Sequence, residues 1–217
     1  MAHVTPSFTG LDSARIASNL ERVRERIASA GGDPAAVEIC AAIKYVPADE
    51  LGALADAGIE LVGENRAQDL VEKHSRWGGA FTWDFIGALQ SRKVKDIAPI
   101  VRLIHSVASE SALRKLEANP AREVLIEVNV AGEESKAGIA PADLPSFIDQ
   151  CPVPVTGLMC MPPPVERPED NRPHFARLAE LAAEHGLKRL SMGTTQDFEA
   201  AVAEGATIVR LGTVLYD

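Results

Sequence analysis

Apolar runs alternate with amphipathic segments along almost the whole chain, and this alternation restricts the fold more than any other feature. Runs typical of β-strands lie at residues 37–43, 59–63, 83–87, 103–107, 123–130, 153–161, 189–192 and 207–211. Segments typical of helices lie between them, at 48–57, 66–76, 91–98, 109–118, 141–150, 172–185 and 195–204. Strict alternation predicts an α/β fold with a parallel sheet and helices outside it. Eight repeats favour a closed (β/α)8 TIM barrel, although an open doubly wound sheet tolerates the same count.

A further helix is expected before the first strand, at 12–30. Its apolar residues recur at positions 16, 20, 23 and 27, which places them on one face. Asp12 can cap its first turn, and Gly31 with Gly32 ends it. The chain ends at Asp217, directly after the eighth expected strand, so we expect no helix after that strand and expect the leading helix to cover the gap. No shift in composition marks a boundary, so residues 1–217 are expected to form a single domain.

Composition and charge argue against several classes of protein. The 217 residues are 46% hydrophobic and 24% charged, which is ordinary for a globular protein. No apolar run approaches the roughly 18 residues of a membrane span, and the N-terminus lacks the pattern of a secretory signal. The net charge of −9 argues against a broad nucleic-acid surface. Three cysteines without a CxxC pair favour reduced thiols in a cytoplasmic protein, and five histidines without ligand-like spacing argue against a metal site.

Lys44 lies at the end of the first expected strand, where the presence of a charged side chain calls for an explanation. The run before it is apolar, and lysine is almost never fully buried unless another group pairs with it or uses it. A desolvated lysine can lose its proton near neutral pH and attack a carbonyl group to form a Schiff base. The alternative is a lysine whose stem lies along the strand end and whose amine is solvated.

A second group of candidates follows the last two strands. In a parallel barrel the active site forms at the carboxyl ends of the strands, and the loops after strands seven and eight often bind phosphate. Here both loops carry glycine and threonine, and Thr194 or Thr195 can cap a helix whose free N–H groups favour an anion. Well-capped turns without a ligand are the equally weighted alternative. The residues of this group are Ser191, Gly193, Thr194, Thr195, Arg210, Gly212 and Thr213.

Strand parity places Arg210 on the inside of the barrel if Val209 and Leu211 face the helices. A buried arginine needs a partner. An anionic ligand, a pyridine nitrogen or a carboxylate such as Glu127 would each serve. By the same parity Glu127 and Asn129 are expected to point inward from the fifth strand.

Several segments, in order over nearly the whole chain, resemble the pyridoxal 5′-phosphate (PLP) homeostasis protein family. They include AIKYV at 42–46, GENRAQ at 63–68, WDFIGALQSRKVK at 83–95, VNVAGEESKAG at 128–138, LSMG at 190–193 and VRLGT at 209–213. The resemblance implies a single barrel similar to the N-terminal domain of alanine racemase. Two departures stand out: Ala88 replaces a histidine usual in the family, and Thr194 with Thr195 replaces a frequent Met-Ser pair.

The same resemblance implies a PLP site and assigns its residues. Lys44 would carry PLP as a Schiff base, and Arg210 would face the pyridine nitrogen. Asn65 and Met159 would line the ring. The phosphate would be held by Ser191, Thr194, Thr195, Gly212 and Thr213.

The chain offers little that would turn bound PLP into an enzyme, so no catalytic residue is assigned. An arginine at the pyridine nitrogen disfavours protonation of the ring and weakens it as an electron sink. Racemisation needs a second acid or base. Tyr45 is expected to alternate away from Lys44, and Tyr216 lies one residue from the end. The leading hypothesis is a monomeric cytoplasmic PLP carrier that supplies apo PLP-dependent enzymes. A small amino-acid racemase and a sugar-phosphate enzyme with a Schiff-base lysine are the alternatives.

Lys136 raises a separate question. It lies in an acidic loop segment, EESKAG at 133–138, where a solvated side chain held by its glutamate neighbours is the favoured interpretation. A second PLP site or transfer site is the other.

Overall fold

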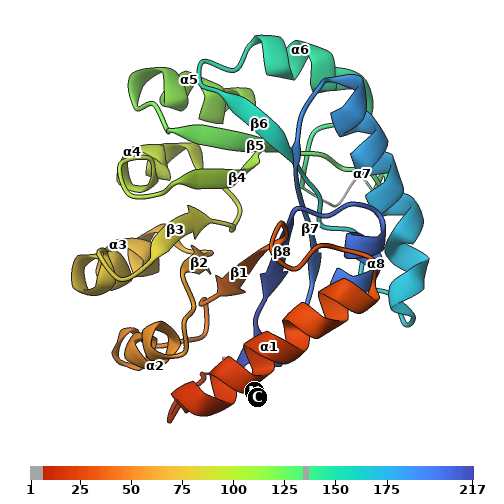
Figure 1. Cartoon of the computed structure of the whole chain (residues 1–217). Helices are drawn as coiled ribbons and strands as arrows, with labels where there is room; N and C mark the ends of the chain where they lie inside the picture. Colours follow the sequence, from red (N-terminus) through yellow and green to blue (C-terminus); the bar gives the residue numbers. More distant parts are fainter. Residues whose placement is uncertain (1–6, 134–136) are drawn as a thin grey trace, which may run out of the picture.

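Eight parallel strands close into a barrel in a computed structural model, which describes residues 7–133 and 137–217 (Figure 1). The strands follow one another around the barrel in chain order, and the last pairs with the first through the register Cys40↔Arg210. This confirms the (β/α)8 barrel and excludes the open sheet. The strands are β1 Glu38–Ala42, β2 Leu61–Glu64, β3 Thr82–Phe85, β4 Leu103–Val107, β5 Glu123–Glu127, β6 Val155–Met159, β7 Arg189–Thr194 and β8 Ile208–Leu211.

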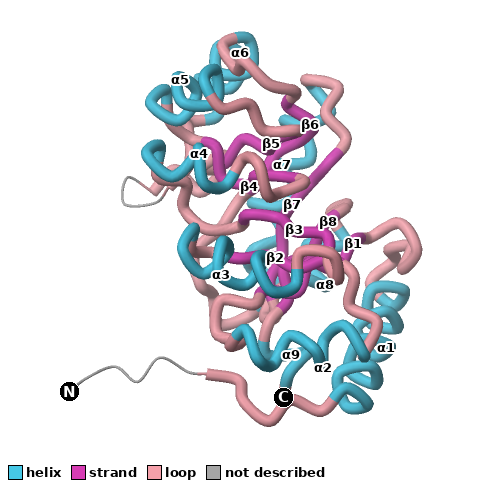
Figure 2. Tube along the Cα trace, turned by 90° about the vertical axis from the view of Figure 1, so that its left-hand side faces the viewer, coloured by secondary structure: helices cyan, strands magenta, loops and turns pink. Residues whose placement is uncertain are grey.

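Helices surround the barrel, one or more after each strand (Figures 1 and 2). In the described part of the chain the α-helices are α1 Ser13–Ser29, α2 Leu51–Asp56, α3 Ala67–Trp77, α4 Val94–Ile97, α5 Glu110–Ala118, α6 Leu144–Asp149, α7 Arg172–Glu184, α8 Phe198–Ala203 and α9 Thr213–Tyr216. Short 3-10 helices lie at Ala48–Glu50, Ser91–Lys93, Pro141–Asp143 and Pro168–Asn171.

The leading helix is placed as its sequence predicts. The Asp12 carboxylate accepts a hydrogen bond from the Arg15 N–H at 3.0 Å, and the helix ends before Gly31, whose φ is 89°. Helix α1 packs against α2, α8 and α9, so it covers the side of the barrel between the first and last repeats (Figures 1 and 2). The Asn19 amide joins α1 to the end of the chain, since Nδ2 donates to the carbonyl oxygens of Leu215 at 3.0 Å and Asp217 at 2.9 Å.

Two expectations about the end of the chain are wrong. A short helix, α9, follows β8 where none is expected. Helix α8 begins at Phe198, three residues after its expected start, because the segment from Thr194 to Asp197 forms a hydrogen-bonded turn instead. A six-residue helix results, and neither Thr194 nor Thr195 lies at its cap.

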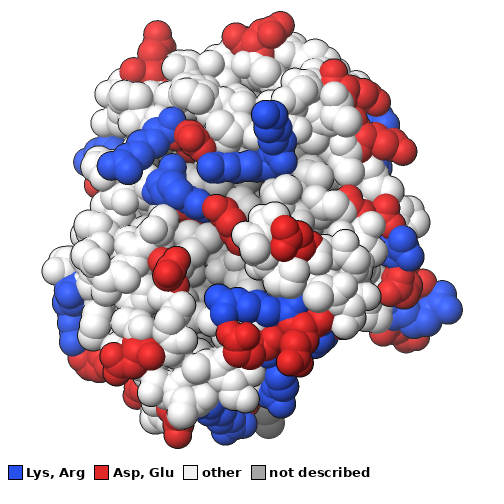
Figure 3. Space-filling view, in the orientation of Figure 1, with Lys and Arg blue, Asp and Glu red and all other residues white. Residues whose placement is uncertain are grey.

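Most of the core lies between the sheet and the helices, and a smaller cluster fills the barrel interior. The interior cluster comprises Cys40, Leu61, Ile86, Leu103, Leu125, Met159 and Ile208. Cys40 and Cys160 are buried free thiols and Cys151 is half-buried. Among the described residues, no helix is long and apolar enough to cross a membrane. Acidic and basic side chains are interspersed on the face shown in Figure 3.

Candidate functional site

Lys44 lies in the turn that follows β1, with its side chain exposed. Its Nζ lies 4.7 Å from the centroid of the Tyr45 ring, a cation–π distance. The expectation that Tyr45 points away from Lys44 is therefore wrong, because the tight turn after the strand breaks the alternation. Both residues line a cavity of about 390 Å³ on this side of the barrel mouth, together with Asp69 and Arg76.

A buried ion pair that sequence reasoning missed supports this turn. The Lys73 ammonium, from α3, donates to Glu64 Oε2 at 2.5 Å and to the carbonyl oxygen of Ile43, next to Lys44, at 2.7 Å. The other oxygen of Glu64 accepts from the N–H of Asn65 at 2.6 Å. The pair therefore ties the ends of β1 and β2 to helix α3. The sequence signal for this ion pair is the position of Lys73. It follows buried Leu70 by three residues and therefore lies on the inner face of the helix.

Arg210 points into the barrel as parity predicts and is only 4% exposed. Its Nη1 donates to the Ser191 carbonyl oxygen at 2.7 Å and to Ser191 Oγ at 2.6 Å, and its Nη2 donates to the Cys160 carbonyl oxygen at 2.9 Å. Its direct partners are thus neutral oxygens. Glu127 is buried as expected, and burial raises the pKa of its carboxyl group while the positive charge of Arg210 opposes that rise. Asn129 is half-buried, and its amide donates to the Glu133 carbonyl oxygen at 2.7 Å.

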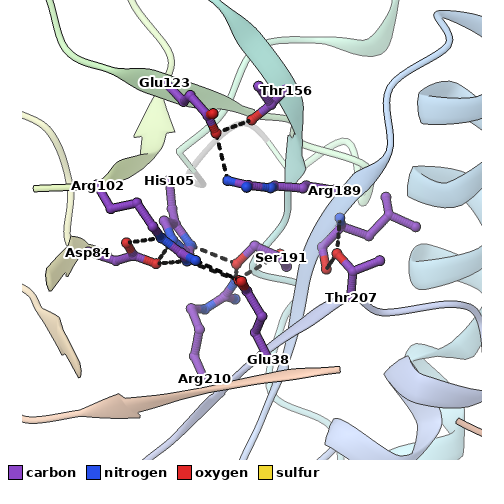
Figure 4. Close-up of polar contacts among 11 residues, drawn as sticks. Glu38, Asp84, Arg102, His105, Glu123, Thr156, Arg189, Ser191, Thr207 and Arg210 are labelled. Carbon is purple, nitrogen blue, oxygen red and sulfur yellow. Dashed lines mark hydrogen bonds and ion pairs between the residues drawn. The ribbon is translucent and has the colours of Figure 1, made fainter. Parts of the chain in front are cut away.

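From Arg210 a chain of polar side chains crosses the barrel interior (Figure 4). Ser191 Oγ lies 2.8 Å from His105 Nδ1, and His105 Nε2 lies 3.0 Å from Asp84 Oδ2. Arg102 donates two hydrogen bonds to Asp84, at 3.0 and 2.7 Å, and two more to Glu38. Parity places Asp84 and His105 inside the barrel on the neighbouring strands β3 and β4, but the contact between His105 and Ser191 crosses the interior from β4 to β7, so no single segment of the sequence shows it.

The turns after β7 and β8 lie side by side, as expected. Gly212 N–H donates to Thr195 Oγ1 at 3.1 Å, which links the two turns directly. Asp197 Oδ1 accepts from the N–H and the hydroxyl of Thr194, at 2.7 and 2.9 Å. Gly193 adopts a φ of 87°, and a Cβ there would lie 2.8 Å from the Phe198 Cα. Glycine is thus required at that position.

A cavity with a volume of about 570 Å³ lies beside these turns at the carboxyl ends of the strands. Arg210, Thr194, Gly193 and Asp197 line it, and the proline-rich loop at 161–168 forms its other side. Asn171 also lines it, and its Oδ1 is buried without a hydrogen-bond partner among the described residues.

The structure brings some of the predicted site residues together and leaves others apart. Thr194 and Arg210 share the 570 Å³ cavity. Thr195 and Gly212 adjoin it through their hydrogen bond, Ser191 lies buried beneath it, and Thr213 is exposed at the start of α9.

The other predicted site residues lie elsewhere. Met159 belongs to the interior cluster. Asn65 lines a separate small cavity of about 100 Å³ with exposed Ala88, and its Oδ1 is buried without a partner in the described part of the chain. Lys136 lies outside the described residues.

Comparison with known proteins gives a consistent result. The model of the alanine racemase N-terminal domain family matches residues 11–217. The chain is 40% identical to a pyridoxal phosphate homeostasis protein of Aquifex aeolicus, with 93% of this chain and 96% of that protein covered. It is 38% identical to the protein of that name from Pseudomonas aeruginosa, with 93% of each chain covered.

Solved structures agree with these relatives. PipY of Synechococcus elongatus, solved with PLP bound, is 30% identical with a TM-score of 0.79, covering 93% of this chain and all of PipY. A lysine/ornithine decarboxylase of Vibrio vulnificus shares the fold, with a TM-score of 0.67, but at 14% identity and over 62% of its own chain. The chain is therefore a member of the pyridoxal phosphate homeostasis protein family, built on the alanine racemase N-terminal domain fold.

Proposed function

We propose that this protein binds PLP and takes part in PLP homeostasis, holding the cofactor on Lys44 and delivering it without transforming a substrate. The observation that carries the proposal is the Arg210 cavity, where a buried cation and two glycine-threonine turns meet at the carboxyl ends of β7 and β8. Full-length similarity to PLP homeostasis proteins and to PLP-bound PipY supports it.

The residues of this cavity fit the parts of PLP. A volume of about 570 Å³ lies in the range of small-molecule sites. The turns that carry Thr194, Thr195 and Gly212 bring together hydroxyl and backbone N–H groups of the kind that bind phosphate. In this structure the Thr194 donors are used by Asp197 and the Gly212 N–H by Thr195, so a bound phosphate would have to replace these partners. Arg210 supplies a buried guanidinium donor. Among the described residues no carboxylate accepts a hydrogen bond from it, so a pyridine nitrogen is a suitable partner. When bound, PLP supplies an aldehyde that condenses reversibly with a primary amine and releases water.

Lys44 is the amine that we assign to this bond, although its Nζ faces Tyr45 rather than the Arg210 cavity. Its side chain is exposed, and a four-carbon stem can reorient at little cost. The Lys73–Glu64 pair holds the Ile43 carbonyl and therefore the turn from which Lys44 extends. We propose that Asn65 and Met159 line the ring side and that Ser191 and Thr213 complete the phosphate end.

A carrier is favoured over a racemase because two candidates for a second base, Tyr216 and Cys160, are poorly suited to that role. The Tyr216 hydroxyl is buried and donates to the Ala42 carbonyl oxygen at 3.3 Å, and burial raises its pKa well above the ordinary value. Burial likewise raises the pKa of the Cys160 thiol to about 12. We further propose that the protein acts as a cytoplasmic monomer and that apo PLP-dependent enzymes receive the cofactor.

Absorbance and borohydride reduction test the assignment of Lys44. We expect a yellow protein whose colour is fixed by borohydride onto the Lys44 peptide, a colourless Lys44→Ala variant, and an unaffected Lys95→Ala control on the exposed side of α4. A Lys44→Ala variant that stays fully yellow would refute the assignment. A wild-type protein that takes up no PLP would refute the proposed function and leave the sugar-phosphate enzyme as the alternative.

Two further measurements separate a carrier from an enzyme. We expect the holo-protein to activate an apo PLP-dependent enzyme even when a trap removes free PLP. We also expect no sustained exchange of the α-proton of L- or D-amino acids for solvent deuterium. Sustained racemisation would contradict the carrier role, and activation that the trap abolishes would contradict direct delivery.

A further inference from the structure

The chain of buried polar side chains next to Arg210 is a feature that PLP binding alone does not explain. It runs from Glu38 and Arg102 through Asp84, His105 and Ser191 to Arg210, so that it links the two ends of the barrel (Figure 4). Asp84, His105 and Ser191 are each fully buried. Buried polar groups are costly unless all are satisfied, so a connected chain of this length needs a purpose.

The donors at one end fix the direction of every hydrogen bond in the chain. Arginine has no acceptor, so Ser191 Oγ accepts from Arg210 Nη1 and its own hydrogen is free to donate to His105 Nδ1. His105 then carries its proton on Nε2 and donates it to Asp84 Oδ2. The ring is neutral in this arrangement, in agreement with burial, which lowers the pKa of His105. Arg102 in turn neutralises Asp84.

Asp84, His105 and Ser191 have the hydrogen-bond order of a catalytic triad, but their setting excludes that role. Neither Ser191 nor His105 is exposed, and neither lines the cavity that Arg210 lines. Ser191 Oγ also accepts a hydrogen bond from a cationic donor, which makes it a weaker nucleophile. The chain therefore acts on Arg210, not on a substrate.

The polar chain and its neighbours affect Arg210 by occupying particular N–H groups of its guanidinium. Both Nη1 hydrogens are used by Ser191, and Nη2 is used by the Cys160 carbonyl oxygen and approached by the Met161 sulfur at 3.8 Å. Within the described residues the Nε hydrogen is the one left over for a ligand. A guanidinium is planar, so anchoring one edge sets the direction of the other.

We propose that His105 and Asp84 are positioning residues that orient Arg210 toward the ring of bound PLP. This inference rests on the proposed function for its purpose, but the orientation of Arg210 itself can be measured without PLP. His105 holds the Ser191 hydroxyl in the rotamer that accepts from Arg210, and Asp84 holds the His105 tautomer. Loss of either weakens the hydrogen bond from Arg210 to the Ser191 hydroxyl and leaves the guanidinium held by the Ser191 and Cys160 carbonyl oxygens alone, so its orientation is less well fixed.

Nitrogen-15 NMR of the apo-protein tests the orientation directly. We expect the Arg210 Nε–H signal, assigned by its loss in Arg210→Lys, to shift and to exchange faster with water in His105→Leu and Asp84→Asn. His105→Gln, which keeps a donor and an acceptor, should restore part of the wild-type signal. Glu123→Gln is the matched control, because its pair with Arg189 also bridges strands of the barrel but does not touch Arg210 (Figure 4).

PLP titration followed by absorbance tests whether this orientation of Arg210 serves PLP binding. Binding should weaken about tenfold in His105→Leu and in Asp84→Asn, the loss of roughly one hydrogen bond to a charged group, with a displaced absorption maximum. Wild-type affinity, spectrum and Arg210 signal in both variants would overturn the inference. If His105→Leu does not fold, Asp84→Asn, which nearly preserves volume, decides alone. Absence of PLP binding in the wild type would instead refute the proposed function and leave the NMR result valid.

Discussion

At the scale of single residues, the buried charges of Asp84 and Glu64 remain tolerable because each carboxylate has several partners. Burial alone would raise the pKa of Asp84, but hydrogen bonds from His105 and Arg102 lower it below the ordinary value. Glu64 accepts hydrogen bonds on both oxygens. Removing one member of such a group leaves the others buried and unsatisfied, so single substitutions here should have large effects.

Lys73 gives the simplest prediction of this kind. Lys73→Met should lower the free energy of unfolding by about 3–5 kcal/mol, because Glu64 is left as an uncompensated buried charge. Glu64→Leu combined with Lys73→Met should recover part of that loss. Urea unfolding measures both, and Lys95→Met on the exposed side of α4 should change stability by no more than about 0.5 kcal/mol. A single variant as stable as this control would contradict the buried pair.

His105 predicts a pH dependence of stability. Its pKa is lowered in the folded state, so the unfolded chain binds a proton below the ordinary value of 6.5 while the folded protein resists it. The stability contribution of the neutral ring is thus complete above pH 6.5 and is lost as the pH falls through the lowered pKa. The groups that face the ring are Asp84, Ser191, Arg102 and Arg210, and the two arginines oppose its protonation.

Urea midpoints between pH 7.5 and 5 measure this dependence. We expect stability to fall over that range in the wild type and in His174→Gln, a partly exposed histidine of α7, and to fall less in His105→Gln. Equal slopes in all three proteins would show that His105 does not titrate differently on folding.

At the scale of elements, the end of β7 packs closely against helix α8 at Gly193. A Cβ at Gly193 would meet the Ala201 Cβ at 2.7 Å and the Phe198 Cα at 2.8 Å, whereas Gly31, with a similar positive φ, faces open space. Gly31→Ala should therefore show only the cost of the left-handed backbone, about 1–2 kcal/mol.

Gly193→Ala should cost about 1–3 kcal/mol more than Gly31→Ala, because overpacking adds to backbone strain. It should also weaken PLP binding, since the displaced turn carries Thr194 and Thr195. Thermal unfolding and PLP titration of the two variants decide this. Equal stability and equal affinity would mean that the turn yields without moving the site.

The helices and strands also show which features can be predicted from the sequence. The eight strands and the inward direction of Arg210 follow from patterns confined to one segment each, and all are confirmed. The late start of α8 depends on Asp197 bonding back to Thr194, and the short helix α9 on its packing against α1, which segment patterns do not encode. The contact between His105 on β4 and Ser191 on β7 crosses the interior, so it appears only when the barrel closes. The position of Lys73 beside Glu64 requires the docking of α3 for the same reason.

At the scale of the whole molecule, the closed barrel predicts one cooperative unit. Each strand pairs with a neighbour on both sides, so no group of strands can separate without breaking the hydrogen bonds between two pairs of strands. Trp77 and Trp83, the two tryptophans, both belong to the first half of the chain, whereas far-ultraviolet circular dichroism reports on every helix. Fluorescence and dichroism should therefore give the same urea midpoint, as residues 1–217 forming a single domain requires.

PLP at a hundred times its dissociation constant should raise both midpoints together, by about 2.7 kcal/mol of stability. A fluorescence transition that precedes the dichroism transition would show that the first repeats open on their own and would contradict a single domain.

The seam between β1 and β8 has a consequence for how the chain is made. β1 leaves the ribosome before the other strands of the barrel, yet one of its two neighbours is the last of them, β8. Until β8 arrives, one edge of β1 presents unpaired backbone groups beside an apolar interior. Ring closure between such distant segments is slow, so this edge stays exposed during synthesis for longer than any other strand edge of the barrel and is the one most open to pairing with another chain.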